Sequence, residues 1–178
     1  MVSSQGKSFA LTVLVVAGIF LSGLAMLAAL NRRDERVGLQ TEIQYDDFAY
    51  ALINVSKDYA RAEVKPQDEI YVLRIKIINH AKRVDYLFRR NQAILVDHRG
   101  RYYHYSPEAQ AAFDAGTAPN TCANPIPAGS SCTTDLVFEL PPDARPKHLK
   151  FVGSSPVTEL LDFIFYGNKR IELEGESN

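Results

Sequence analysis

Apolar residues recur at every second position over much of this chain, and this period constrains its fold more than any other feature. In EIYVLRIKIINH, residues 69–80, Leu73 and Ile75 fall on one face of an extended chain. Arg74 and Lys76 fall on the other face. Alternation of this kind is typical of a β-strand with one buried face, because a helix repeats every 3.6 residues instead.

The same period predicts further strands, separated by turn residues. They span residues 48–55, 84–88, 93–105, 133–140, 148–152 and 160–166. Short strands at this spacing are typical of an antiparallel sandwich of two sheets. One short helix interrupts them at residues 107–115, because Ser106 can cap its first turn, Pro107 suits the first helical position and Gly116 can end it.

The sequence DHRG, residues 97–100, predicts a tight hairpin in which Gly100 takes the left-handed conformation and forms a bulge. In this register Asp97 faces Arg101, and Leu95 lies opposite Tyr103 on the core face. Ala93 then lies opposite Tyr105.

The other face of this hairpin is the best candidate for a binding surface. It comprises Ile94, Val96, Tyr102 and His104, flanked by Arg99 and Arg101. Tyrosine and arginine are enriched at binding interfaces because each buries a large area while keeping polar reach. The alternative is that the helix at 107–115, or a second layer of strands, covers this face.

Residues 9–30 contain no charged side chain. As a helix with about 1.5 Å rise per residue they are long enough to cross a bilayer. We expect a signal anchor at 9–30, with a short cytoplasmic tail at 1–8 and a linker at 31–36. A cleaved secretory signal is the alternative, since small residues stand near the end of the segment. The spacing of small residues such as Gly18 and Ser22 can also let two helices pair as a homodimer.

The charges that flank this segment argue for the opposite direction, because Lys7 precedes it whereas Arg32, Arg33 and Arg36 follow it. Cys122 and Cys132, however, are the only cysteines and are too far apart for CxxC chemistry. We expect them to form a disulfide, a bond that persists in oxidising compartments. This favours a domain outside the cytoplasm, in the periplasm or at the cell surface.

Composition and motifs exclude several functions. Twenty basic against 21 acidic residues argue against a nucleic-acid-binding role, which normally needs a basic face. The four histidines, His80, His98, His104 and His148, show no ligand spacing. Phosphate loops, GxSxG and HExxH are absent from the sequence. We therefore expect no catalytic residue, cofactor or resident metal.

Three stretches resemble a bacterial family known as a domain of unknown function: YVLRIKIIN ending at Asn79, LVDHRGRYY, and PAGSSCTTDLVFELP. The matching positions are Leu95, Asp97, Gly100, Tyr103, Pro127, Gly129, Phe138 and Pro141. The resemblance covers about residues 37–173. It implies an immunoglobulin-like sandwich, similar in shape to a small secreted immunoprotective antigen, that sits outside the membrane. We place this domain at residues 37–174, followed by a tail at 175–178.

Three functional hypotheses remain. The first is a non-catalytic membrane-anchored domain that binds an envelope protein or ligand. The second is an envelope enzyme or metal-handling factor that uses histidine and acidic side chains. The third is a cytosolic domain, as the flanking arginines indicate. The sequence names neither the partner nor the oligomeric state.

Overall fold

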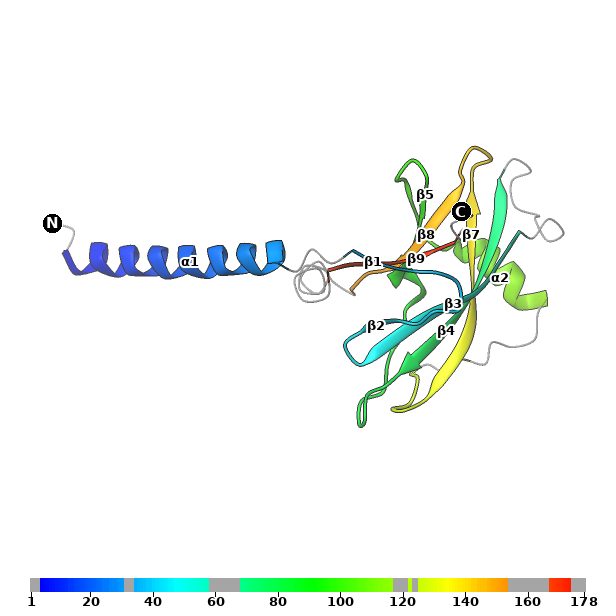
Figure 1. Ribbon diagram of the computed structural model, residues 1–178, viewed down its shortest axis with the longest axis horizontal. Helices are drawn as coiled ribbons and strands as arrows, with labels where there is room; N and C mark the ends of the chain where they lie inside the picture. The colour runs from blue at the N-terminus through cyan, green and yellow to red at the C-terminus, as the bar shows by residue number, and fades with distance from the viewer. Residues whose placement is uncertain are drawn as a thin grey trace.

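The structure is a computed structural model that describes residues 4–30, 34–57, 68–116, 122, 125–153 and 167–173. Within these ranges, strands form two sheets that pack face to face as a sandwich (Figure 1). The five-stranded sheet has the order β1-β9-β8-β5-β6, and the four-stranded sheet has the order β2-β3-β4-β7.

The strands are short and are accompanied by two α-helices and one 3₁₀ turn. The elements are α1 Ser4–Leu30, β1 Asp34–Val37, β2 Ile43–Tyr45, β3 Phe48–Lys57, β4 Glu69–Asn79, η1 Arg90–Gln92, β5 Ala93–Asp97, β6 Tyr102–Tyr103, α2 Pro107–Gly116, β7 Ser131–Leu140, β8 Pro146–Phe151 and β9 Asn168–Glu172.

The core lies between the sheets and is built from the alternate positions that the sequence pattern indicates. Leu73 and Ile75 of β4 meet Leu95 of β5 and Leu149 of β8, and all four are fully buried. Burial of one such side chain stabilises the fold by roughly 1.5–3 kcal/mol. The apolar face of each strand is therefore the side that faces the core.

Most of the predicted strands are present, but two predictions need comment. Residues 84–88 form only an isolated bridge between Tyr86 and Ile126, so the strand predicted there is wrong. Val84 and Leu87 are exposed, and Asn79 donates from Nδ2 to the carbonyls of Val84 and Ile126, which holds the segment in place as irregular backbone. The strand predicted at 160–166 lies outside the described residues.

The first and last strands have no alternating apolar pattern, and their pairing was not predicted. β1 runs parallel to β9, with Asp34 opposite Asn168 and Val37 opposite Ile171. Charged side chains join them, including Arg170 Nη2 at 2.7 Å from Asp34 Oδ2. The linker predicted at 31–36 is therefore too long, because the sheet already begins at Asp34.

The hairpin prediction is confirmed. Gly100 has a φ of 78°, Leu95 pairs with Tyr103, and Asp97 accepts from Arg101 across the turn. β6 comprises only Tyr102–Tyr103 and ends before Tyr105. The expected pairing of Ala93 with Tyr105 is therefore not part of the β5–β6 ladder.

Helix α2 begins as predicted, since Ser106 Oγ accepts from the Ala109 N–H at 3.3 Å. Its Ala109 and Phe113 pack on Ile70 and Val137, on the outer face of the four-stranded sheet. It therefore does not pack on the β5–β6 face, as one of the two alternatives considered from the sequence would require.

Cys122 and Cys132 form the expected disulfide, with their Cα atoms 5.0 Å apart. The helix expected at 9–30 is present as α1 (Figure 1). Among the described residues, no helix meets the length and hydropathy required to cross a membrane.

Candidate functional site

The turn between β5 and β6 is organised by Asp97, whose side chain is only 2% exposed. Its Oδ1 accepts from the main-chain N–H groups of Arg99 and Arg101, both at 2.9 Å. Its Oδ2 accepts from Arg101 Nε at 2.7 Å and from the Tyr103 hydroxyl at 3.2 Å. Four donors therefore compensate the buried carboxylate and hold the turn in one conformation.

These contacts decide the charge of Asp97. Burial alone would raise its pKa, but the hydrogen bonds from the main chain and side chain of Arg101 and from the Arg99 N–H outweigh burial, so the pKa lies below its usual value. Asp97 is thus a fixed negative charge that positions two arginines.

The loop between β7 and β8 brings a second carboxylate to the same place. Asp143 Oδ2 accepts from Arg101 Nη1 at 3.2 Å and also pairs with Arg99 Nη1. The hydrogen bond from Arg101, with the charge of both arginines, lowers the pKa of Asp143 despite partial desolvation. The main chains of hairpin and loop are joined as well, because the His98 N–H donates to the Arg145 carbonyl at 3.1 Å.

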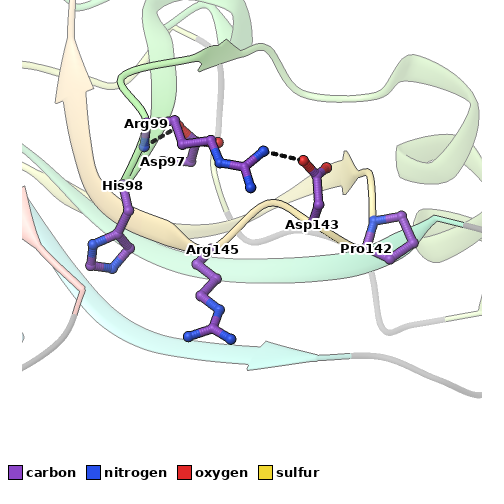
Figure 2. A pocket seen from close by; sticks show the side chains of 6 residues that line it. All are labelled: Asp97, His98, Arg99, Pro142, Asp143 and Arg145. Atoms are coloured by element: carbon purple, nitrogen blue, oxygen red, sulfur yellow. Dashed lines mark hydrogen bonds and ion pairs between the residues drawn. The ribbon is translucent and has the colours of Figure 1, made fainter.

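A pocket of about 360 Å³ opens where hairpin and loop meet. Its lining residues are Asp97, His98, Arg99, Pro142, Asp143 and Arg145. Figure 2 shows the Arg99 side chain reaching toward Asp143, whereas His98 and Arg145 project together in another direction. We call this site the hairpin pocket.

The remaining residues of the predicted binding surface lie on the outer face of the five-stranded sheet. Tyr102 is 61% exposed, Ile94 is half-buried and His104 is exposed. Val96 is only 4% exposed, so its inclusion in the surface is wrong. It lies in the middle of the sheet, between Tyr102 of β6 and His148 of β8, and neighbours on both sides cover it.

The outer face gains a cation from β8. Lys150 is the register partner of Ile94, and its Nζ lies 4.8 Å from the centre of the Tyr102 ring. A cation over a tyrosine ring is attracted by the ring's negative face. We call the exposed or half-buried residues Ile94, Tyr102, His104 and Lys150 the outer face.

The four histidines differ in burial. His80, His98 and His104 are exposed, whereas His148 is buried in β8. Over the described ranges, no three His, Cys, Asp or Glu side chains are grouped so that they could hold a metal ion.

The model of one protein family, described as "Domain of unknown function (DUF4352)", matches residues 37–159. This range is more than half of the chain. The chain belongs to the DUF4352 family. The matched range includes the whole hairpin pocket and the outer face. No protein with a curated description matches the chain in sequence.

Three solved structures are similar to this DUF4352 domain in shape. One is the secreted protein MPT63 of Mycobacterium tuberculosis, with a TM-score of 0.54, 14% identity, and 79% of this chain and 98% of that chain covered. The candidate lipoprotein ycdA of Bacillus subtilis has a TM-score of 0.51 and 12% identity, covering 78% of this chain and 39% of its own. The yjhA protein of the same species has a TM-score of 0.50 and 11% identity, covering 78% and 99%. At these identities the similarity shows the fold alone.

Sequence reasoning found the two arginines of the DUF4352 hairpin but missed their partners. Asp143 pairs with Arg99, and the Arg145 carbonyl accepts from the His98 N–H. Both residues lie in the loop PPDAR, more than 40 positions from Arg99, and no local period connects them. The available signal was the loop itself, because paired prolines and an aspartate before the next strand are typical of a turn at a sheet end.

Proposed function

We propose that this chain is a membrane-anchored, extracytoplasmic binding domain. Residues 9–30 anchor it, residues 1–8 stay in the cytoplasm, and the immunoglobulin-like sandwich stands in the periplasm or at the cell surface. It acts through binding of an envelope protein and not through catalysis. The outer face is its contact surface.

Two observations support this location. The disulfide between Cys122 and Cys132 is of a kind that persists in oxidising compartments. The described part of α1 also presents large apolar side chains to its surroundings, with Leu14 at 70% and Ile19 at 69% exposure. Each such side chain gains roughly 1.5–3 kcal/mol when it leaves water, which favours a lipid environment. MPT63 is described as secreted and ycdA as a candidate lipoprotein, which agrees with this address.

The exposure of Tyr102 is the observation that carries the binding role. The sandwich has two outer faces, and α2 packs on one of them through Ala109 and Phe113. On the other face Tyr102 remains 61% exposed beside Lys150. An exposed aromatic ring with a cation at its side has the composition of an interface centre, where tyrosine is enriched.

Site-specific photo-crosslinking in intact cells tests this role. A photoreactive phenylalanine analogue at position 102 should give one discrete crosslinked species. The matched control carries the same analogue at Glu108, an exposed position on α2, and should give none. Equal products at both positions, or no product at position 102, would contradict the proposal.

A further inference from the structure

A second pocket, of about 260 Å³, lies beside helix α2 on the outward side of the four-stranded sheet. Residues of three neighbouring strands and of the helix line it: Asn54 and Ser56 of β3, Val72 and Arg74 of β4, Asp135 of β7 and Phe113 of α2. We call this site the helix pocket, and we propose that it binds a neutral sugar unit. Asn54, Arg74 and Asp135 supply the hydrogen bonds, and the ring of Phe113 packs against the sugar. This inference does not depend on the partner of the outer face, which belongs to the other sheet.

The strand register places three polar side chains of the helix pocket in one row across the sheet. Asn54 is the register partner of Arg74, and Arg74 is the register partner of Asp135. Register partners on antiparallel strands direct their side chains to the same face, with Cβ atoms about 4.5–5.5 Å apart. The row lies on the outward face, because Leu73 and Ile75 on either side of Arg74 are fully buried in the core.

The groups in this row are held in place and still have hydrogen-bonding capacity. Arg74 donates from Nε to Asp135 Oδ1 at 2.8 Å and from Nη2 to Asp135 Oδ2 at 3.1 Å, a fork that fixes both side chains. Arg74 Nη1 remains as a donor, and the carboxylate keeps lone pairs as acceptors. In the described part of the chain, the Asn54 amide and the Ser56 hydroxyl have no hydrogen-bond partner. Sugar hydroxyls both donate and accept, so they match a row that presents both kinds of group.

The charges of the helix pocket are balanced. Lys57 also lines the pocket, and its Nζ lies 2.8 Å from Glu69 Oε2. Arg74 pairs with Asp135. Each of the two cations therefore has its own carboxylate, and the four side chains carry no net charge. A site of this kind gives a charged ligand no net attraction, which favours an uncharged one.

An apolar wall stands beside the polar row. Phe113 packs on Ile70, Val72 and Val137, and both Phe113 and Val72 line the pocket. A sugar ring has one face of C–H groups, which can pack on an aromatic ring while the hydroxyls at its rim reach polar groups. The pocket volume is just below the range of about 300–1,000 Å³ that is usual for drug-sized ligands, so it suits one sugar unit.

The test is a titration of the full chain with the methyl glycosides of glucose, galactose, mannose and N-acetylglucosamine, followed by NMR of the main-chain amides. The chain is held in a polyoxyethylene detergent, which carries no sugar. We expect at least one glycoside to give saturable shifts at Asn54, Arg74 and Asp135. It should bind at least about tenfold more tightly than cyclohexanol, which keeps a six-membered ring but has a single hydroxyl. The absence of saturable shifts with all four glycosides, equal binding of cyclohexanol, or tighter binding of the anion glucuronate would overturn the assignment.

Two variants make the result independent of stability. Asn54→Ala, at an exposed position, should weaken binding of the best glycoside by about tenfold, because it removes hydrogen bonds to the ligand. Asp135→Asn should also weaken glycoside binding but should strengthen glucuronate binding severalfold, since Arg74 then has no carboxylate partner. Asn91→Ala, at an exposed asparagine outside the pocket, is the matched control and should bind as the wild type. Unchanged glycoside affinity in both pocket variants, or an equal loss in Asn91→Ala, would refute the proposal.

Discussion

Asp97 and Arg101 face each other across the β5–β6 turn, with Arg101 Nε 2.7 Å from Asp97 Oδ2. The pair differs from an exposed ion pair because the Asp97 side chain is almost fully buried. Asp97 contacts the core through the hydroxyl of Tyr103, whose ring packs against the core from β6. On its other side Asp97 contacts the arginines of the hairpin pocket. The positions of these arginines in the pocket therefore depend on the Asp97 carboxylate.

Removal of the carboxylate should destabilise the whole hairpin. Asp97→Ala leaves buried donors without an acceptor and should lower the free energy of unfolding by about 2–4 kcal/mol. Asp97→Asn should cost less, because its amide oxygen can still accept from the Arg99 and Arg101 N–H groups. Urea unfolding at pH 7, followed by circular dichroism, measures both. Asp47→Asn, at an exposed position, should change stability by less than about 0.5 kcal/mol.

The buried His148 predicts a loss of stability in mild acid. Burial lowers its pKa to about 4, and neighbouring positive charges act in the same direction. The unfolded chain takes up this proton near pH 6.5. Because the folded-state pKa is the lower one, stability is fully present above about pH 6.5 and is lost as the pH falls toward 4, by on the order of 2–3 kcal/mol.

The charged groups that face His148 come from three strands: Asp34 on β1, Arg170 and Glu172 on β9, and Lys147 and Lys150 on β8. The measurement is the free energy of unfolding at several pH values for the wild type and for His148→Leu. The variant should show a shallower decline between pH 6.5 and 4. His104→Gln, at an exposed histidine, should keep the wild-type slope. A wild-type slope in His148→Leu would show that another group is responsible.

The disulfide should stabilise the domain through the loop that it closes. Cys122 and Cys132 are 10 positions apart, and closing a loop of this length removes about 2–3 kcal/mol of unfolded-state freedom in the chain-entropy model. The double variant Cys122→Ser, Cys132→Ser should have a free energy of unfolding that is lower by this amount, and its urea midpoint should be lower accordingly. A reductant should shift the wild type to the same midpoint and leave the variant unchanged. If the wild type and the double variant have the same urea midpoint without reductant, the disulfide does not contribute to stability.

Gln110 covers main-chain groups of β7, which is the last strand of the four-stranded sheet within the described residues. It is 1% exposed, its Oε1 accepts from the Val137 N–H at 3.0 Å, and its Nε2 donates to the Asp135 carbonyl at 3.2 Å. An uncovered strand edge is a template for association with other chains. Gln110→Leu should cost about 1–3 kcal/mol and speed hydrogen exchange at Val137. Glu108→Gln on the exposed side of α2 should do neither.

The features that could be predicted from the sequence depend on the two-residue period of the strands and on the residues of the turns. Leu73 and Ile75 lie on one face because side chains alternate along a strand, and Gly100 ends the hairpin because it tolerates a positive φ. Asp97 opposite Arg101 followed from that turn. The pairing of β1 with β9 could not be predicted, since Asp34 and Arg170 are joined by charge across 136 positions. The approach of Asp143 to Arg99 depends in the same way on where the β7–β8 loop ends in space.

The central claim is that the sandwich is located outside the cytoplasm. The accessibility of its cysteine sulfur atoms in living cells tests this claim most directly. Intact cells are treated briefly with a reductant and then with a thiol reagent that cannot cross membranes, and the full chain is recovered for mass spectrometry. An extracytoplasmic domain predicts labelling of Cys122 and Cys132 in intact cells, and only after reduction. If both cysteines react in lysed cells but remain unlabelled in intact cells, the domain lies in the cytoplasm and the account is contradicted.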